Sequence, residues 1–497
     1  MISEGYTGRK GIGGFYRVNR EKGKRKEAID LVSGEYREQQ KPDIPALNEA
    51  GRSLTKLLNH DSTHGRFAWN VMGQTLAYAA ALVGDVSDNA NSIDQAMRMG
   101  FNWKFGPFEL MDQLGTGWFV ERLAKSGMAV PGFLKIVAGR PIYRIENGLR
   151  QVVGLDGAYH AIMCPEGVLL LEDIKRVSQP ILKNGSAALW DVGDGVACFE
   201  FISKINSFDT DSLSLIHESI QVVKDNFKAL VIYNDSQLFS AGANLRLVTS
   251  AAKAGDWDKI ERLIKEGQRA FTALKYAPFP VVAAPSGMAL GGGCEIVLAA
   301  DAVQAHAELN IGLVEVGVGL IPGWGGCKEM LQRWATLGRL PQGPMPAVMK
   351  AFEIISAATV SKSAADAKEL LFMRPDDGVT KNRDRLLTDA KTKALSLVKE
   401  YKPPTQMTFN LPGPSGCVTM ELAAQSFHKL GKASDYDGVL LGELTKVLSG
   451  GDTDILTPVT ENDVLALERK HFMHLVHDDR SVNRIVHMLE TGKPLRN

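Results

Sequence analysis

The distribution of apolar residues predicts a helical first module. From Phe67 to Val83 the apolar content is nearly continuous, which is typical of a helix buried on most sides. Ser87 can cap a second helix, because its side-chain oxygen can accept a hydrogen bond from the first helical turn. Gly106-Pro107 then breaks the chain, and a third apolar helix starts at Phe108. We therefore expect a helical module that extends to about Val137.

From Ala187 the pattern changes to strands that alternate with helices. Val196 to Phe201 and Ala229 to Tyr233 are short apolar runs and are predicted strands, separated by a predicted helix from Asp211 to Phe227. The segments that continue the pattern are a strand over 279–284, a helix over 260–274, a short buried helix over 296–300, a strand over 303–307 and a helix around 329–334. This alternation favours an α/β domain.

These patterns divide the chain into four expected segments. They are a helical module over residues 1–138, a linker with some strand content over 139–186, an α/β domain over 187–400 and a helical C-terminal extension over 401–497. The Gly11–Tyr16 stretch does not spell the Gly-x-Gly-x-x-Gly fingerprint, and no predicted strand precedes it. A nucleotide-binding loop is therefore not expected there.

The composition argues against a nucleic-acid-binding, a membrane-spanning and a disulfide-stabilised protein. Lys plus Arg and Asp plus Glu both total 57, so the net charge is zero and no nucleic-acid or membrane-surface partner is indicated. The five cysteines are scattered without a Cys-x-x-Cys pair, which argues against a disulfide framework or a zinc site and fits a cytoplasmic protein. The first residues lack the apolar core of a signal peptide, and no stretch is long and apolar enough to span a membrane.

Candidate chemistry gathers around three glycines between a predicted strand and a predicted helix. Gly291-Gly292-Gly293 leaves the backbone open to a ligand, and the helix start offers amide donors that can stabilise an oxyanion. Glu295 follows within that helix, and Glu315 lies twenty residues later in another apolar surround. Taken alone, the glycines fit a tight packing turn with a solvated glutamate equally well. A second turn, Phe239 to Asn244, strengthens the catalytic interpretation: two amides can polarise a carbonyl while two glutamates share a water.

These residues resemble the enoyl-CoA hydratase/isomerase (crotonase) family over roughly residues 187–397, which implies a core of ββα units in a spiral. The resemblance implies an oxyanion hole made by the Ala243 and Gly292 amides, with Glu295 and Glu315 as catalytic carboxylates. Leu320 to Gly326 looks like the family's Ile-Pro-Gly-x-Gly-Gly segment. The implied coenzyme A contacts are Lys204, a weaker match, and Ala241. Asn244 departs from the family, in which aspartate is commoner, but its side chain can make the same turn-type hydrogen bonds.

The first module is similar to a second family, the C-terminal helical domain of 3-hydroxyacyl-CoA dehydrogenases. Trp103 to Phe108, with Asp112 and Gly115, carries this resemblance, and Gly13 to Tyr16 is similar to the segment that closes that domain's first helical repeat. The order of the two parts resembles one group of fused fatty-acid β-oxidation enzymes. The dehydrogenase's nucleotide-binding domain would lie upstream of Met1.

Together the resemblances imply an enoyl-CoA hydratase, because both glutamates are kept. No metal or redox cofactor is expected, coenzyme A arrives with the acyl-CoA thioester substrate, and NAD is not expected to bind. Two alternatives stay open: a Δ3,Δ2-enoyl-CoA isomerase, which needs one carboxylate, and a non-catalytic subunit that docks to a dehydrogenase. The apolar surface of the helical module also predicts a homo-oligomer or a separate dehydrogenase or thiolase subunit as partner.

Overall fold

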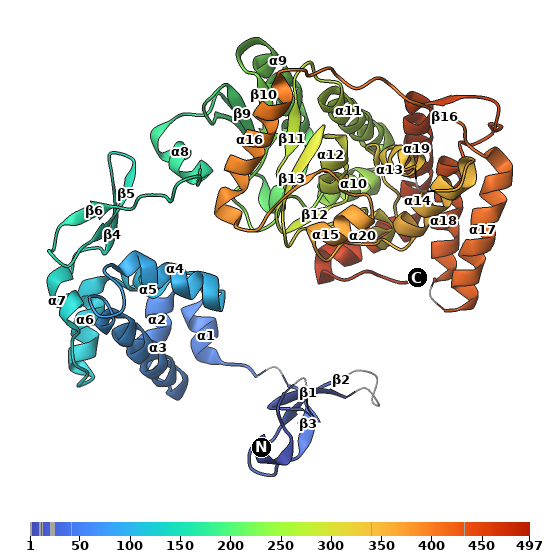
Figure 1. Ribbon diagram of the computed structural model, residues 1–497. Coiled ribbons are helices and arrows are strands. Elements are labelled where there is room, and N and C mark those ends of the chain that lie inside the picture. The colour runs from blue at the N-terminus through green and yellow to red at the C-terminus, as the bar shows by residue number, and fades with distance from the viewer. Residues whose placement is uncertain are drawn as a thin grey trace. The chain divides into compact units, whose positions relative to one another are not determined.

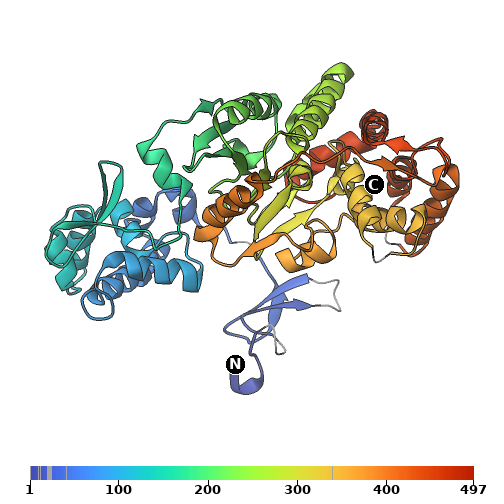
Figure 2. The ribbon, with the colours of Figure 1, turned by 45° about the horizontal axis from the view of Figure 1, so that its top comes forward.

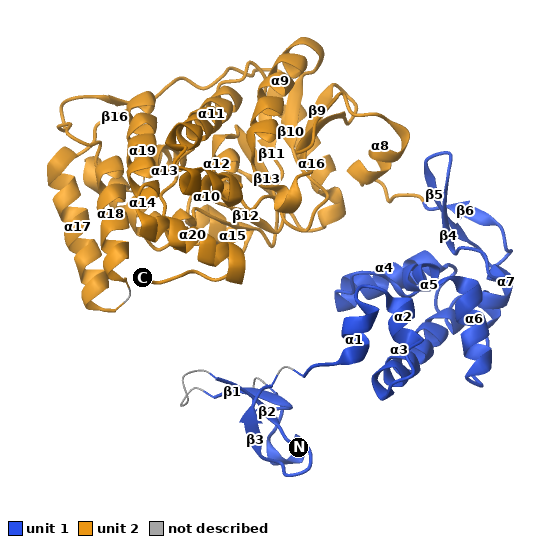
Figure 3. Cartoon of the chain, turned by 180° about the vertical axis from the view of Figure 1, so that it is seen from behind, with its two compact units in different colours: residues 1–162 blue, residues 163–497 orange. Residues whose placement is uncertain are grey.

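The computed structural model describes residues 2–8, 11, 13–19, 25–40, 42–338, 340–431 and 433–497. Ile12, within the Gly11–Tyr16 stretch, lies outside these residues. The chain forms two compact units, residues 1–162 and residues 163–497 (Figure 3). The boundary falls inside the predicted linker, so this segment is divided between the two units.

The predicted helices of the first unit are present. They are α1 (Pro45–Ala50), α2 (Leu54–Leu58), α3 (Thr63–Ala81), α4 (Ala90–Phe101), α5 (Pro107–Leu114), α6 (Thr116–Lys125) and α7 (Gly132–Val137), after a 3-10 turn η1 (Ile2–Glu4). Helix α4 is capped by Asn89, whose side chain accepts from Ser92 N–H, and not by Ser87 as predicted. Both residue types cap helices well, so the sequence pattern alone did not decide between them.

Helix α3 corrects a second expectation. Trp69 and Leu76 are buried, but Phe67 and Tyr78 are each 68% exposed, so this helix is not buried on most sides. A nearly continuous apolar run has no polar face to mark the solvent side, which is why the sequence did not reveal the exposure. The exposed apolar side chains leave part of α3 without a cover among the described residues of its unit.

Two small antiparallel sheets add to this otherwise helical unit. The first consists of β1 (Tyr16–Asn19), β2 (Arg25–Ile29) and β3 (Tyr36–Glu38), and the second of β4 (Tyr143–Glu146), β5 (Leu149–Val153) and β6 (Tyr159–Ala161). The first sheet was not predicted, because its strands are short and charged, and all but one of their residues are exposed or half-buried. The second accounts for the strand content expected after residue 139.

The second unit is built on a seven-stranded sheet in the order β15-β13-β11-β10-β9-β8-β7 (Figure 1). Its strands are β7 (Leu182–Lys183), β8 (Ala187–Asp191), β9 (Val196–Phe201), β10 (Ala229–Ile232), β11 (Val281–Ala283), β13 (Ala302–His306) and β15 (Gly378–Thr380). From β9 to β15 neighbouring strands are parallel, whereas β7, β8 and β9 pair antiparallel. The predicted α/β class is confirmed.

Helices cover both faces of this sheet, so its strands are apolar on both sides. Helix α16 (Leu386–Val398) packs on the face that carries Cys198 and Val231 (Figures 1 and 2). Helices α9 (Thr210–Asn226) and α11 (Trp257–Lys275) belong to the core on the other face, with Phe199 and Leu230.

The remaining elements before residue 400 are α8 (Leu171–Val177), η2 (Lys204–Asn206), α10 (Leu245–Ala254), β12 (Met288–Leu290), α12 (Gly292–Ala299), β14 (Asn310–Gly312), η3 (Glu315–Val318), α13 (Gly326–Thr336), α14 (Pro344–Ser356), α15 (Ala364–Glu369) and η4 (Arg383–Arg385).

The C-terminal extension is helical, as predicted, and shares the core of the α/β part. It contains α17 (Gly413–Lys429), α18 (Asp435–Leu448), α19 (Glu461–Val476) and α20 (Asp479–Thr491), with a short antiparallel pair, β16 (Thr408–Phe409) and β17 (Val459–Thr460). Tyr436, Leu444 and Phe472 belong to the same buried cluster as Phe199 and Val297. The extension is therefore part of the second unit and not a separate body. None of the described helices is both long and apolar enough to cross a membrane.

Candidate active site

Two glycine turns lie side by side at the centre of the second unit. Ser240 pairs with Ala289 of β12, and Leu290 N–H donates to Ser240 O at 3.0 Å. Gly242 (φ +86°) and Gly291 (φ +54°) both take positive φ, which glycine adopts without strain. A β-carbon on Gly242 would stand only 2.9 Å from the Gly292 nitrogen, so the two turns are in direct contact.

This contact brings the two predicted oxyanion donors together. The Gly292 nitrogen opens α12, and the Ala243 nitrogen lies 3.5 Å from where a β-carbon on Gly292 would stand. Within the described part of the chain, neither N–H donates to a backbone or side-chain acceptor. Two neighbouring unpaired amides, one of them at the start of a helix, can bind one carbonyl oxygen and stabilise negative charge on it.

Glu295 is buried one turn into α12 and is held by the backbone of a second glycine-rich turn. Its Oε1 accepts from Trp324 N–H at 2.8 Å and from Gly326 N–H at 2.9 Å. Burial raises the pKa of Glu295 to about 7, against the opposing effect of these backbone hydrogen bonds. Its carboxyl group can therefore gain or lose a proton near neutral pH.

Glu315 reaches the same place from η3, beyond β14. Gly291 N–H donates to Gly312 O at 3.0 Å, and Glu315 Oε1 lies 3.2 Å from where a β-carbon on Gly291 would stand. Its Oε2 is buried and has no hydrogen-bond partner among the described residues. Burial and the nearby Glu295 raise the pKa of Glu315 well above its ordinary value. The structure thus brings both predicted glutamates to the glycine turn.

The candidate coenzyme A contacts lie on two hydrogen-bonded segments. Lys204 is exposed on η2, and Ala241 N–H donates to Ile205 O in that same 3-10 turn at 3.2 Å. The Asn244 side chain accepts from Arg246 N–H at 3.2 Å, so it makes the turn-type hydrogen bond expected at this position.

Sequence reasoning missed one buried carboxylate next to this site. Glu468 of α19 is fully buried, and its two oxygens accept from Gly325 N–H at 2.7 Å and Lys328 N–H at 2.9 Å. A single glutamate in a helical pattern carries no motif, so the sequence held no signal that could have identified it. In the described portion of the chain no group of three or more His, Cys, Asp or Glu side chains is suited to hold a metal ion.

Comparison with known families agrees with this geometry. Residues 193–339 match the family model for enoyl-CoA hydratase/isomerase, and residues 67–131 match that for the 3-hydroxyacyl-CoA dehydrogenase C-terminal domain. The first match contains both glycine turns, Glu295 and Glu315. Both predicted resemblances are therefore confirmed.

Two relatives align along almost the whole chain. A probable 3-hydroxyacyl-CoA dehydrogenase of Bacillus subtilis is 37% identical over 510 residues, covering 100% of this chain and 63% of the relative. A putative fatty acid oxidation complex trifunctional enzyme of Rickettsia felis is 31% identical over 492 residues, covering 98% of this chain and 61% of the relative. The chain thus spans less than two thirds of the length of either relative.

Among solved structures, an enoyl-CoA hydratase from Bacillus halodurans is 13% identical with a TM-score of 0.42, covering 61% of this chain and 99% of that chain. The assignment itself comes from the two family models and the long relatives. Over residues 193–339 the chain is similar to the enoyl-CoA hydratase/isomerase family, and over residues 67–131 it is similar to the C-terminal domain of the 3-hydroxyacyl-CoA dehydrogenase family.

Proposed function

We propose that the chain is an enoyl-CoA hydratase that adds water to 2-enoyl-CoA thioesters to give 3-hydroxyacyl-CoA, as a step of fatty-acid β-oxidation. The observation that carries this proposal is the meeting of two unpaired amides, one from each glycine turn, with two glutamates: Glu295 is buried, and Glu315 is half-buried with a buried Oε2. Hydration of a conjugated thioester needs both parts: donors for the developing enolate oxygen, and an acid and a base for the elements of water.

In this mechanism the thioester oxygen binds between the Ala243 and Gly292 amides. Glu295 takes a proton from water as the water oxygen bonds to Cβ, and Glu315 gives its proton to Cα. The glutamates have then exchanged protonation states and return to the starting state by proton exchange with solvent. This assignment is supported by Glu295 Oε1 accepting two backbone N–H groups, which favours its ionised form. It is also supported by the stronger upward shift of the pKa of Glu315, which favours the protonated form.

The substrate's coenzyme A part would lie against η2 and the 240–243 turn, with Lys204 and Ala241 as contacts. The exposed Lys204 offers a positive charge to a phosphate. Ala241 lies in the turn that carries the Ala243 donor, and its N–H donates to Ile205 O of η2. Coenzyme A would enter only as part of the substrate. No metal or redox cofactor is part of this proposal.

The experiment is a direct assay. The purified chain should consume crotonyl-CoA without added metal or nucleotide, and the ultraviolet absorbance of the conjugated thioester should fall. Short-, medium- and long-chain 2-enoyl-CoA substrates would cover the unknown chain length. If none is consumed, the hydratase proposal fails and a non-catalytic subunit becomes the better interpretation.

The isomerase alternative makes a different prediction in the same assay. A Δ3,Δ2-enoyl-CoA isomerase moves a proton between carbons of one substrate, so it would convert 3-enoyl-CoA without hydrating 2-enoyl-CoA. The presence of two carboxylates with raised pKa at the site favours hydration, because an isomerase needs only one.

We further propose that the exposed face of α3 is covered by another subunit, either a second copy or a separate dehydrogenase or thiolase chain. Phe67, Val71 and Tyr78 supply this apolar surface. Light scattering at several protein concentrations tests the first case. A stable monomer that binds neither partner would contradict the proposal.

A further inference from the structure

Two buried carboxylates from distant parts of the chain hold one turn of the backbone. This turn, residues 324–328, carries Gly325 (φ +111°) and includes the first three residues of α13. Glu295 of α12 accepts from the Trp324 and Gly326 amides, and Glu468 of α19 accepts from the Gly325 and Lys328 amides. The two glutamates therefore share four amide groups at the start of one helix, where such groups otherwise lack partners.

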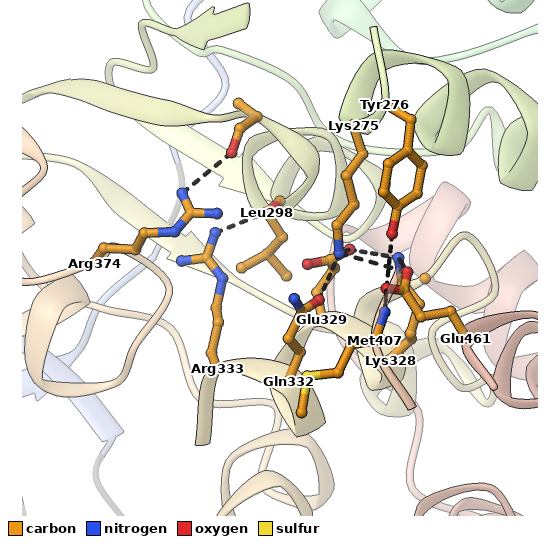
Figure 4. Close-up of polar contacts among 12 residues, drawn as sticks. Lys275, Tyr276, Leu298, Lys328, Glu329, Gln332, Arg333, Arg374, Met407 and Glu461 are labelled. Carbon is orange, nitrogen blue, oxygen red and sulfur yellow. Dashed lines mark hydrogen bonds and ion pairs between the residues drawn. The ribbon is translucent and has the colours of Figure 1, made fainter. Parts of the chain in front are cut away.

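Helix α19 is tied to the same turn by a second contact. The Lys328 ammonium group lies 3.0 Å from Glu461 and 2.5 Å from Glu329. Lys275 of α11 joins this buried ionic cluster through Glu329 at 2.7 Å, and Tyr276 donates to Glu461 at 2.7 Å (Figure 4). The first and eighth residues of α19 thus both reach the end of the turn, Glu461 through the Lys328 side chain and Glu468 through the Lys328 amide.

We propose that Glu468 is a positioning residue for the hydration reaction: it fixes the 324–328 turn so that the Trp324 and Gly326 amides hold the Glu295 carboxylate in place. This inference rests on the proposed hydratase function. It assigns the C-terminal extension a part in the active site, although the extension lies outside the residues that match the hydratase/isomerase family model.

The placement of Glu468 is costly unless it serves the turn. Burying a carboxylate removes its hydration, and here burial and the nearby Glu295 raise its pKa to about 8. An apolar side chain would fill the same space without this cost. Both oxygens of Glu468 accept hydrogen bonds from backbone amides of the turn. An apolar side chain could not make these bonds, so the role of the carboxylate is to fix the backbone geometry of the turn.

The test compares Glu468→Gln and Glu468→Ala with Glu443→Gln as a matched control. Glu443 is also buried in the extension, but its contacts are His471, His474 and Lys446, and not the turn. A displaced catalytic group typically costs about 10²-fold, so we expect that loss of kcat in Glu468→Ala with a much smaller change in KM. Glu468→Gln keeps one acceptor oxygen and should lose less. The control should keep nearly full activity.

Two further measurements separate positioning from a general packing role. Amide hydrogen exchange should speed up at both Gly325 and Lys328 in Glu468→Ala, should speed up at one of them in Glu468→Gln, which keeps one acceptor, and should stay slow in the control. The acidic limb of the kcat/KM profile should keep its position in Glu468→Gln. Burial and the nearby Glu295 raise the pKa of Glu468 to about 8, so its side chain is already neutral where Glu295 titrates, near pH 7, and glutamine removes no charge there. A lower kcat with an unmoved acidic limb therefore indicates lost geometry and not a changed charge.

Several results would overturn the inference. Wild-type kcat in a folded Glu468→Gln protein would do so, and so would an equal loss in Glu443→Gln, because the loss would then follow stability alone. If Glu468→Ala does not fold, the nearly isosteric Glu468→Gln decides. If the wild-type chain hydrates no substrate, the proposed function fails, and exchange at the two amides alone shows whether Glu468 holds the turn.

Discussion

The indole ring of Trp324 fills the space where a β-carbon on Gly292 would stand, with ring atoms 2.6 and 2.8 Å from that point. The ring is buried and packs edge-on against Phe208 and Phe271, with centroids 5.6 and 5.5 Å away. Trp324 also donates its amide to Glu295. One residue thus links the proposed oxyanion donor to a proposed catalytic carboxylate.

Gly292→Ala should therefore damage the site even though the added group is small. The new methyl group would collide with the Trp324 ring, which is packed against Phe208 and Phe271. Overpacking of this kind costs about 1–3 kcal/mol of stability. Displacing one oxyanion donor costs about 10²–10³-fold in kcat, so we expect a loss near that range. Initial rates with crotonyl-CoA provide the measurement.

Gly438→Ala is the matched control for this change. Gly438 lies within α18, and a β-carbon there would meet nothing within 4 Å. Alanine is the better helix former, so this variant should be as stable as wild type or slightly more stable, by about 0.5–1 kcal/mol, with unchanged kcat. Full activity in Gly292→Ala would show that the Gly292 amide does not bind the substrate oxygen.

Glu295→Gln and Glu315→Gln should each lower kcat by roughly 10²–10⁴-fold, because each removes one partner in proton transfer. Substrate binding should change far less, since the amide donors remain. Steady-state kinetics with circular dichroism as a check on folding measure both effects. If only one variant is inactive, the isomerase alternative gains support. Near-wild-type rates in both variants would mean that the two glutamates have only a structural role.

The pH dependence of stability should reveal the burial of Glu295. Its pKa in the folded protein is about 7 and its ordinary value is 4.5, so the folded state binds the proton more tightly than the unfolded chain. The resulting penalty is absent below about pH 4.5, grows up to about pH 7 and is complete above it. Glu295→Gln, which stays neutral, should therefore be more stable than wild type at pH 8, with a smaller difference at pH 5.

Urea unfolding of both proteins at the two pH values measures this difference. The comparison is clean because both backbone hydrogen bonds end on Oε1, an acceptor that glutamine keeps. Glu295→Ala is the contrasting variant: it leaves the Trp324 and Gly326 amides unpaired and should lose stability at both pH values. A difference between wild type and Glu295→Gln that does not change with pH would mean that Glu295 does not titrate in this range.

The elements of the α/β part could be predicted because short apolar runs between glycines and prolines have few other structures available. The observed β9 matches the predicted strand over Val196 to Phe201, and β10 ends one residue before the predicted Tyr233. The glycine turns were predictable for a local reason, since Gly242 and Gly291 need positive φ.

What the sequence missed depends on contacts between distant residues. The exposure of Phe67 depends on which neighbours pack against α3, and a uniformly apolar helix does not indicate this. Glu468 reaches its partners across 140 and 143 residues of chain. A glutamate in a helix looks the same in sequence whether it faces water or a buried turn, so only the packing of α19 reveals its role.

The last prediction concerns NAD. A dehydrogenase seats the pyrophosphate of NAD on a glycine loop between a parallel strand and a helix. The described strands of the first unit form only two antiparallel sheets, and helices α3 and α4 begin with amides already capped by Ser62 and Asn89. We therefore expect no measurable NAD binding by calorimetric titration; a low-micromolar dissociation constant would overturn this expectation.

A coupled assay makes the same prediction with its own positive control. The chain, crotonyl-CoA and NAD should lose the enoyl thioester absorbance without forming NADH, because hydration proceeds and oxidation does not. Adding a separate 3-hydroxyacyl-CoA dehydrogenase should then produce NADH from the accumulated product. NADH formation before that addition would mean that the chain oxidises 3-hydroxyacyl-CoA itself, and that the first unit binds the nucleotide in a way its antiparallel sheets do not predict.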